Sequence, residues 1–332
     1  MSADEKDLQK QAATFRARTQ QLRERMHQVI VGQDDTLELL IVATFADGHV
    51  LIEGPPGLGK TLMVKSLSQC LSLKFNRIQF TPDLMPADIT GTTVITTGAA
   101  GERSFTFEPG PLFTNILLAD EINRAGPKTQ SALLQAMQER EVSLFGRHYP
   151  LAEPFLVFAT QNPIELAGTY PLPEAQLDRF IFKVLIAAPT QEELMEIAHR
   201  TIGASQPHLD PVLHEQEIRD FRALVRKIPV ARPILLEVTR AIMRTRPQNP
   251  ESPAIARRYV RYGVSPRGLQ AVLLAAKVRA GLEGRFNVSL EDVQAFWLPA
   301  LRHRIILDVS AGLDGITADK VLQDIVIDRP AP

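Results

Sequence analysis

Cysteine pairs, long apolar runs and an excess of charge of one sign are all missing from this sequence of 332 residues. Cys70 is the only cysteine, which excludes a disulfide within the chain and fits a reducing compartment. No apolar run approaches the length that spans a membrane, and the acidic start, Met1 to Glu5, lacks the apolar core of a secretory signal. We therefore expect a cytoplasmic protein with no membrane span.

The formal net charge is only −1. No overall field attracts nucleic acid or an anionic membrane, so neither is an expected partner. Hydrophobic residues make up 45% of the chain and charged residues 23%, as in ordinary globular proteins. The length suggests two domains, or one domain with a substantial lid. Cys70 follows Leu67 at helical spacing, so we interpret it as a small buried residue rather than a redox group.

The most informative stretch runs from His49 to Thr61. It reads as a short apolar strand, a glycine-rich turn and the start of a helix, with the pattern G-x-x-x-x-G-K-[ST]. A surface turn can match this pattern by chance, but here an apolar strand precedes it and an amphipathic helix, expected at about 61–71, follows it. We name residues 54–61 the phosphate loop: Gly54, Pro55, Pro56, Gly57, Leu58, Gly59, Lys60 and Thr61, with Leu62 directly after it.

Each residue type in the phosphate loop suits the binding of ATP. The glycines let successive backbone N–H groups point at phosphate oxygens, and the following helix directs its positive end at the same anion. Lys60 places a charge on the outer phosphates, and the hydroxyl of Thr61 suits Mg²⁺. We therefore expect ATP and Mg²⁺ as cofactors. No His/Cys cluster has metal-ligand spacing, so no other protein-bound metal is expected.

A second apolar strand, Ile116 to Asp120, ends in two acids. An uninterrupted apolar run fits a strand that is buried on both faces of a parallel sheet, and ligands bind at the carboxyl ends of such strands. Asp120 would hold Mg²⁺ through water, and Glu121 would orient and deprotonate the attacking water. The alternative is that the two acids merely open a loop, which the nearby phosphate loop makes the weaker interpretation.

Two further strands end near this expected site. One covers 155–160 and leads into Asn162, whose amide can hold the attacking water or sense the γ-phosphate, or can simply cap a turn before Pro163. The other covers 181–187. Together with 49–53, 74–80 and 116–120 these segments alternate with helices, which favours an α/β fold with a five-stranded parallel sheet. The remaining predicted helices of this half are 7–30, whose apolar stripe is a packing surface, 34–46 and 127–139.

Two hairpins interrupt this pattern. The β-rich runs 92–97 and 103–107 flank a turn at 98–101, and a shorter hairpin is expected around 142–149. The longer hairpin is either a decoration or a tool that touches another molecule, and the sequence leaves both open. We place a domain boundary between 188 and 189. An all-helical lid is expected beyond it, with helices at 191–201, 214–228, 234–246, 266–282, 290–303 and 317–325.

Two groups of basic residues in the lid attract attention. The run Arg257 to Tyr262 mixes arginine and tyrosine and could contact nucleic acid, although a solvated face or a subunit contact is the preferred interpretation. Arg267 stands at the first turn of a helix, where a cation is unfavourable unless an anion meets it.

These motifs, in this order, resemble the MoxR family of AAA+ ATPases, which are P-loop NTPases. The resemblance covers about 31–306 and rests on the phosphate loop, the acids in 118–125, the amide in 159–163, the segment 176–180 and the segment 265–268. It implies that Asp120 and Glu121 are the Walker B pair, with Glu121 as the catalytic base. It further implies that Asn162 is sensor 1, Arg179 the arginine finger and Arg267 sensor 2, and that the adenine pocket includes Val31, Gly32 and Gln33.

The resemblance also implies a biological role. An arginine finger that serves the neighbouring subunit requires a homo-oligomeric ring, expected to be a hexamer, in which the longer hairpin usually faces a central pore. Family members commonly act as chaperones that mature partners with von Willebrand A domains, often for metal or cofactor delivery, and no such domain is present in this chain. The alternatives are a metal-chelatase motor subunit, a nucleic-acid motor, and a scaffold that binds ATP but barely hydrolyses it. The hairpin carries only Arg103 against Glu102 and Glu108, which speaks against nucleic acid.

Overall fold

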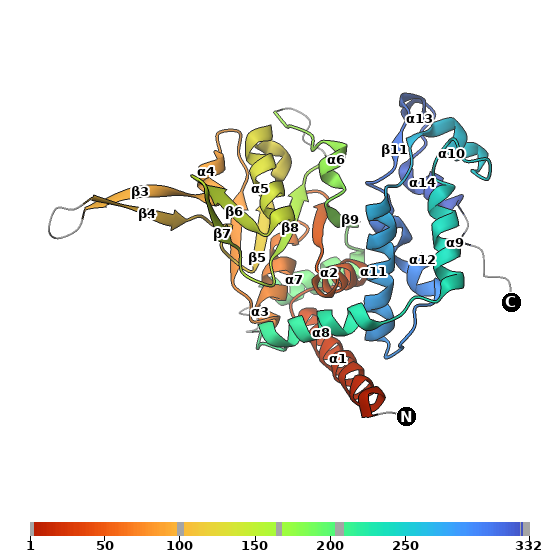
Figure 1. The fold of residues 1–332 in the computed structure, drawn as a ribbon, viewed down its shortest axis with the longest axis horizontal. Helices are drawn as coiled ribbons and strands as arrows, with labels where there is room; N and C mark the ends of the chain where they lie inside the picture. Colours follow the sequence, from red (N-terminus) through yellow and green to blue (C-terminus); the bar gives the residue numbers. More distant parts are fainter. Residues whose placement is uncertain (1–2, 98–102, 164–167, 203–208, 326, 328–332) are drawn as a thin grey trace.

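A parallel sheet of five strands forms the centre of the molecule (Figure 1). The computed structural model describes residues 3–97, 103–163, 168–202, 209–325 and 327. The strand order is β2-β5-β8-β1-β9, and every pairing is parallel, as predicted. The strands are β1 (His49–Glu53), β2 (Phe75–Gln79), β5 (Ile116–Asp120), β8 (Leu156–Gln161) and β9 (Phe180–Leu185).

Both faces of the sheet are buried, which accounts for the nearly continuous apolar strands. Alternate residues of a strand belong to two different hydrophobic clusters: Val50 and Ile52 of β1 pack on one side, and Leu51 packs on the other. Helices supply the other half of each cluster. The first side is covered by α1 (Ala3–His27), α2 (Asp34–Phe45) and α3 (Lys60–Cys70), and the second by α4 (Pro86–Thr90) and α5 (Pro127–Glu139).

The apolar stripe of α1 is a packing surface, as predicted. Phe15 is fully buried, and its ring lies 4.8 Å from that of Phe45 in α2 and 4.7 Å from that of Phe221 in the lid. Cys70 at the end of α3 is also fully buried, and burial raises the pKa of its thiol to about 11. At neutral pH the thiol is therefore protonated and behaves as a small apolar group.

The longer hairpin, β3 (Gly91–Thr97) and β4 (Arg103–Pro109), projects from the side of the molecule opposite the lid (Figure 1). Its predicted turn at 98–101 and Glu102 lie outside the described residues. Ile95 and Phe105 are cross-strand partners, and both are exposed, at 60% and 76%. At its base, Phe107 stacks at 4.0 Å on Tyr149 of the shorter hairpin, β6 (Glu141–Leu144) and β7 (Arg147–Pro150).

The lid follows β9 and packs beside it. The six predicted helices are present as α7 (Gln191–Ile202), α8 (Glu215–Lys227), α9 (Arg232–Met243), α11 (Pro266–Leu282), α12 (Leu290–Leu301) and α14 (Ala318–Gln323). The predicted boundary at 188/189 falls in the connection between β9 and α7 and stays a prediction. One hydrophobic cluster runs from the sheet through α1 and α2 into α11 and α12, so core and lid share their packing.

Several short elements escaped the sequence analysis. They are α4, η1 (Ile122–Arg124), α6 (Glu174–Leu177), α10 (Ala254–Tyr259) and α13 (Val309–Leu313), together with an antiparallel pair, β10 (Val260–Tyr262) and β11 (Ile306–Leu307). This pair departs from a purely helical lid. Its strands are two and three residues long, too short for an alternating pattern to be read from the sequence.

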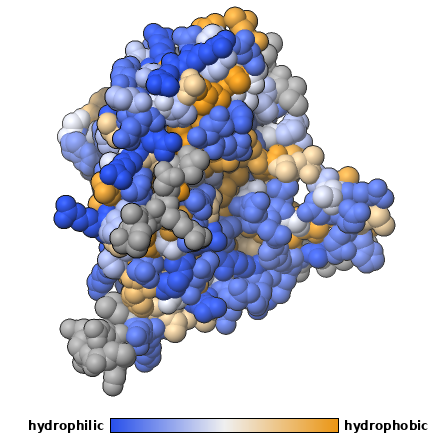
Figure 2. Space-filling view, turned by 90° about the vertical axis from the view of Figure 1, so that its right-hand side faces the viewer, coloured by the Kyte–Doolittle hydropathy of each residue, from blue (hydrophilic) through white to orange (hydrophobic). Residues whose placement is uncertain are grey.

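The basic run 257–262 lies on α10 and β10. Arg258 pairs with Asp314 at 3.0 Å, and the hydroxyl of Tyr259 donates to the same carboxylate at 2.7 Å, whereas Tyr262 is 58% exposed. Figure 2 shows this side of the molecule as largely hydrophilic, with separate apolar patches. Part of the run is thus neutralised within the lid. Over the described ranges, no helix is both long and apolar enough to cross a membrane.

Candidate nucleotide-binding site

The phosphate loop connects β1 to α3 at the carboxyl edge of the sheet. Gly57 and Gly59 have φ angles of 84° and 73°, in the left-handed region that favours glycine, and Gly59 is the N-cap of α3. Gly54 packs against the next strand: a Cβ there would lie 3.1 Å from the Ile186 side chain. The turn therefore requires glycine at two positions for its backbone and at a third for close packing, as in a backbone cradle for phosphate.

Lys60 folds over the loop. Its ammonium donates to the carbonyl oxygens of Gly54 and Pro55, at 2.6 and 3.2 Å. Partial burial lowers the pKa of Lys60, and the nearby carboxylates of Asp120 and Glu121 raise it. The ammonium thus lies between the loop and the two acids, where the outer phosphates of a nucleotide would meet it.

Asp120 ends β5 and Glu121 follows it. One oxygen of Asp120 accepts from the hydroxyl of Thr160 at 2.5 Å, and Thr160 in turn accepts from the Glu121 N–H at 2.8 Å. Glu121 has a φ of 55°, which is uncommon for a residue with a side chain and marks a locally constrained backbone. The two acids are therefore held in different directions, as two different roles would require.

Arg77 and Gln79 of β2 also belong to this site, and the sequence analysis missed them. Arg77 pairs with the second oxygen of Asp120 at 2.7 Å, and the amide of Gln79 donates to Glu121 at 2.7 Å. The available signal was the pair of polar residues at alternate positions, 77 and 79, of the strand predicted at 74–80. Arg124, for which the sequence suggested no role, contacts Glu121 at 3.1 Å.

These groups line one cavity of about 390 Å³. Its walls include part of the phosphate loop, both acids, both β2 side chains and Asn162, which follows β8 and is 7% exposed. The predicted residues that line it are Pro56, Gly57, Gly59, Lys60, Thr61, Leu62, Asp120, Glu121 and Asn162. The structure thus brings together residues from three predicted motifs that are about 40 to 100 positions apart in the chain.

The donor set of this cavity fits Mg²⁺. Thr61 offers a hydroxyl and Asp120 a carboxylate, and Mg²⁺ usually takes only one or two protein ligands beside water and phosphate oxygens. Among the described residues, no group of three or more His, Cys, Asp or Glu side chains could hold a metal ion. Phosphate oxygens of the nucleotide and water would therefore supply most of the ligands of Mg²⁺ in this site.

Val31, Gly32 and Gln33 lie beside the cavity without lining it. The amide of Gln33 donates to the carbonyl of Ala187 at 2.9 Å, one residue beyond the Ile186 side chain that packs on Gly54. Gly32 has a φ of 63° and lies against Glu193 at the start of α7. The segment predicted to meet the adenine is thus linked to the phosphate loop through the chain that follows β9.

Arg179 and Arg267 do not reach this cavity. They line a second cavity of about 290 Å³ together with Gly48 and His49, at the amino ends of the strands, opposite the phosphate loop. Phe180 pairs with His49 at the start of β1, whereas the phosphate loop begins after Glu53 at its end. At about 3.3 Å per residue, the five residues of β1 separate the phosphate loop from the second cavity by roughly 16 Å. We call the part of this cavity wall that carries Arg179 and Arg267 the arginine surface.

The lid fixes the arginine surface through Asp178. Its carboxylate accepts from the Ser265 hydroxyl at 3.0 Å and from the guanidinium of Arg304 at 2.8 Å, which joins the start of α11 to the residue before Arg179. Burial lowers the pKa of Arg179, and the charge of Arg267 lowers it further. Arg267 is exposed and has no hydrogen-bond partner within the described residues. Two like charges are therefore kept side by side.

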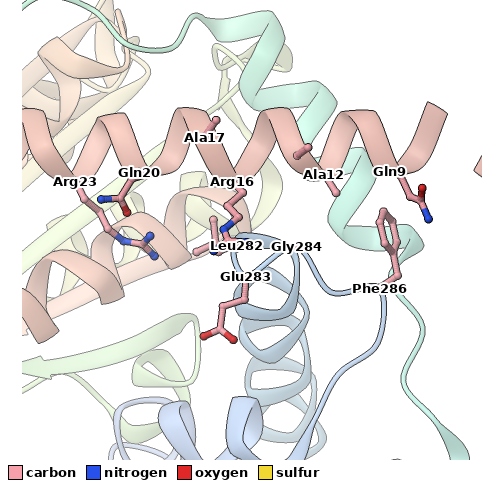
Figure 3. Close-up of a pocket in the computed structure, with 11 residues that line it drawn as sticks. Gln9, Ala12, Arg16, Ala17, Gln20, Arg23, Leu282, Glu283, Gly284 and Phe286 are labelled. Atoms are coloured by element: carbon pink, nitrogen blue, oxygen red, sulfur yellow. The ribbon is translucent and has the colours of Figure 1, made fainter. Parts of the chain in front are cut away.

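A larger cavity, about 740 Å³, lies elsewhere, between α1 and the end of α11 (Figure 3). Alanines of α1 form one wall, and Glu283 and Phe286 stand on the other. It holds none of the residues that the sequence singled out, and its wall offers no phosphate-binding turn. Size therefore does not identify the site in this molecule.

Comparisons with known proteins agree with this geometry. Residues 49–182 match the model of the ATPase family associated with various cellular activities (AAA), and residues 252–325 match the AAA lid domain. Chaperone MoxR1 of Mycobacterium tuberculosis is 42% identical over 301 residues, which are 91% of this chain and 78% of that protein. The chain belongs to the MoxR family of AAA+ ATPases.

Two further relatives extend the match. The uncharacterized protein YeaC of Bacillus subtilis is 41% identical over 304 residues, 91% of each chain. A crystal structure from Cytophaga hutchinsonii, of a protein considered to be an ATPase, superimposes with a TM-score of 0.92 over the full length of both chains at 33% identity. ATP hydrolysis is thus the activity of this MoxR-family chain, and the P-loop NTPase fold with a helical lid is confirmed.

Proposed function

We propose that this AAA+ ATPase hydrolyses ATP between the subunits of a ring, expected to be a hexamer, and uses the motion to remodel partner proteins. The observation that carries the proposal is the position of Arg179 and Arg267, at the sheet edge opposite the phosphate loop. Neither arginine can serve its own phosphate loop, so each is useful only to the loop of a second copy. Head-to-tail contacts of this kind form a ring when the rotation between successive copies closes.

The side chains of one chain would divide the reaction as follows. Backbone N–H groups of the phosphate loop and Lys60 bind the phosphates, and Asn162 orients the attacking water. Glu121 accepts a proton from that water as its oxygen bonds to the γ-phosphorus. The bond to the bridging oxygen breaks, and ADP leaves with that electron pair. Thr61, and Asp120 through water, would hold Mg²⁺, which would stabilise the negative charge of the phosphates.

The neighbouring subunit would complete the site. Arg179 and Arg267 of that subunit would face the γ-phosphate, where positive charge stabilises the charge that develops on the transferred group. An arginine finger contributes about 10³ to 10⁵ in rate. Pairing with phosphate would also relieve the repulsion between the two arginines.

The proposed partners are separate proteins with von Willebrand A domains, or enzyme complexes that need a metal or cofactor. The relative named Chaperone MoxR1 supports a chaperone-like role. The projecting hairpin offers an exposed apolar pair, Ile95 and Phe105, which suits contact with a protein. A chelatase motor is the second candidate. A nucleic-acid motor is disfavoured because the described part of the hairpin carries one basic residue, Arg103, and one acidic residue, Glu108.

The test measures mass by light scattering, with and without ATP and Mg²⁺, together with ATP turnover. We expect a nucleotide-dependent ring in the parent, and turnover at least 1,000-fold lower in Arg179→Ala. Arg240→Ala is the matched control, since it removes an exposed arginine that pairs with Glu237 within α9. A monomer that hydrolyses ATP equally well in the parent and in Arg179→Ala would refute the shared site. A lack of stimulation by DNA at low salt would exclude the nucleic-acid motor.

A further inference from the structure

Arginines surround a cavity of about 360 Å³ where α8 lies beside the amino ends of β1 and β8. Its volume is at the small end of ligand pockets, which run from about 300 to 1,000 Å³. Four arginines and two acids line it: Arg140, Arg219, Arg222, Arg226, Asp47 and Glu153. We call it the α8 cavity. It contains no residue of the phosphate loop, and Asp47 is the residue that it shares with the cavity of the arginine surface.

Three of the four arginines stand on one face of α8. Arg219, Arg222 and Arg226 follow each other at steps of three and four residues, so their side chains point the same way. The buried residues of the helix, such as Phe221 and Val225, belong to the hydrophobic core instead. The helix is therefore held by its apolar side and presents its cations to the cavity.

Backbone carbonyl groups orient the guanidinium groups. Nε of Arg222 donates to the carbonyl oxygen of Thr44 at 2.9 Å, and Nη1 of Arg140 donates to that of Phe155. Arg140 is the C-cap of α5, so the cations approach the cavity from two elements. A carbonyl fixes the position of a cation without cancelling its charge. Little ordering of these side chains is thus left to a ligand, which lowers the cost of binding.

The acids of the wall leave this positive charge incompletely paired. Oδ1 of Asp47 is the shared partner of two arginines, Arg222 at 2.7 Å and Arg140 at 3.1 Å. Arg226 is exposed, and its guanidinium has neither a hydrogen bond nor an ion pair in the described part of the chain. Two guanidinium groups therefore compete for one oxygen, and a third has no acceptor of its own.

The count of charges over the whole group gives the same result. Arg219 has its own partner, Glu215, one turn earlier in α8. The wall itself holds two acids, so three carboxylates stand against four guanidinium groups. Lys277 adds a further cation beside α8, where its ammonium donates to the carbonyl of Arg226 at 3.2 Å. This excess of positive charge is what an anion would neutralise.

Arg222 shows the cost of the arrangement. Its side chain is only 12% exposed, and its Nη2 is buried without a hydrogen-bond partner among the residues that the structure describes. Burial is the main reason why the pKa of Arg222 falls to about 10; the charges of Arg140 and Arg226 also lower it, and that of Asp47 raises it. An unpaired buried donor beside like charges costs free energy, which a bound anion would offset.

We propose that the α8 cavity binds the phosphate group of a small anion, such as inorganic phosphate or pyrophosphate. A guanidinium offers phosphate two parallel N–H donors, and the tetrahedral oxygens of phosphate can meet cations from several directions. A carboxylate offers two oxygens in one plane, which suits a single guanidinium. The proposal goes beyond ATP hydrolysis and does not depend on a ring.

A phosphate in this cavity would join the lid to the core. α8 belongs to the lid, whereas Asp47 and Arg140 belong to the core. A ligand that contacts both sides stabilises the folded arrangement and raises the unfolding temperature as its concentration rises above Kd. Binding can therefore be followed by calorimetry and by thermal unfolding.

The experiment titrates inorganic phosphate and pyrophosphate into full-length Lys60→Ala by calorimetry at constant ionic strength. Lys60→Ala weakens the phosphate loop, so that the α8 cavity dominates the binding of these anions. Arg226→Gln in this background should weaken binding at least about tenfold, the effect of losing a charge-assisted hydrogen bond. Arg226→Lys should restore most of the affinity because it keeps the charge. Arg240→Gln is the matched control, since it removes an exposed arginine that pairs with Glu237 within α9.

Glu153→Gln supplies a test of opposite sign. It removes a negative charge from the wall but keeps the backbone carbonyl that accepts from Arg219 at 2.7 Å, so binding should become about threefold tighter. A residue with a merely structural role would not strengthen binding when it is replaced. Tighter binding of pyrophosphate than of phosphate would assign the site to a diphosphate group, and equal binding would assign it to a single phosphate.

Three results would overturn the proposal. The first is that neither anion binds to Lys60→Ala. The second is unchanged affinity in Arg226→Gln, or unchanged or weaker binding in Glu153→Gln, in proteins that unfold at the same temperature as their parent. The third is binding that Arg267→Ala removes and Arg226→Gln leaves, which would place the anion on the arginine surface. ATP turnover of Arg226→Gln alone should equal that of the parent, so a failure of the shared site leaves this test intact.

Discussion

Mixing two inactive variants should restore ATP hydrolysis, because the phosphate loop and the arginine surface lie at opposite edges of one sheet. Lys60→Ala damages the phosphate loop but keeps the arginines. Arg179→Ala keeps the loop but removes the finger. Each variant alone is expected to lose at least about 1,000-fold in turnover. In a mixed ring, a loop from the second variant can meet an intact Arg179 from the first.

The expected recovery follows from counting interfaces. In a one-to-one mixture, half of the subunits carry an intact loop, and half of their neighbours carry an intact finger. About a quarter of the sites are then complete, so turnover should recover to about a quarter of the parental value. The assay follows phosphate release after the two variants are mixed at concentrations that allow subunit exchange, with each variant alone at the same total concentration.

A second mixture tests whether Arg179 and Arg267 serve the same neighbour. Arg179→Ala mixed with Arg267→Ala should stay inactive, since no subunit then offers both arginines on one surface. Recovery to about a quarter in this mixture would mean that Arg267 serves its own loop. If mass measurement showed mixed rings but the first mixture regained no turnover, the inference that the phosphate loop and the arginine surface of different subunits share a site would be refuted.

Three further predictions concern single positions. Glu121→Gln should retain bound ATP and lower turnover at least about 100-fold, as nucleotide retention on a filter would reveal; parental turnover would exclude Glu121 as the base. Lowering the pH from 7.5 to 5 should cost about 2 kcal/mol of unfolding free energy through His49. Burial lowers the pKa of His49 to about 3 in the folded chain, so only the unfolded chain takes up the proton as the pH falls below about 6.5. Chemical denaturation at both pH values should therefore show a shallower pH dependence in His49→Gln, and an unchanged dependence would contradict the assignment. Phe15→Ala should destabilise the chain by about 3–5 kcal/mol in the same assay, since its ring joins α1, α2 and α8; a loss below 1 kcal/mol, like that of an exposed position, would mean that α1 is not part of the core.

Elements with strong local signals were predicted to the residue. The helix 127–139 begins at a proline, which is favoured at the first helical position, and the structure gives it the same bounds. The same holds for 266–282. The helix predicted from 191 is present too, and a local cap explains its start: Thr190 and Glu193 exchange hydrogen bonds at 2.7 and 3.2 Å. In such cases neighbours in sequence supply all the information, so no tertiary knowledge is needed.

The parts that escaped prediction depend on partners far apart in the chain. Gln79 lies 42 positions before Glu121, and their contact follows from the register between β2 and β5, which a single sequence does not specify. Likewise, Arg179 and Arg267 adjoin each other because Asp178 ties the lid to the end of the sheet. The sequence could suggest which residues have a role, but only packing reveals which of them share one site.

In the proposed ring, the arginine surface would link assembly to nucleotide binding. Arg179 donates to the carbonyl of Leu134 at 2.7 Å, yet its Nε is buried without a partner within the described residues, and Arg267 stands beside it. Burying a guanidinium with an unsatisfied donor next to a like charge costs free energy that a phosphate would recover. A neighbour whose loop holds ATP brings that phosphate, whereas an empty site presents Lys60 beside the carboxylates of Asp120 and Glu121 without the negative charge of the phosphates. The ring should therefore form at lower protein concentration with ATP than without it, and Arg267→Ala should reduce this difference. Equal assembly with and without ATP would mean that other surfaces hold the ring together.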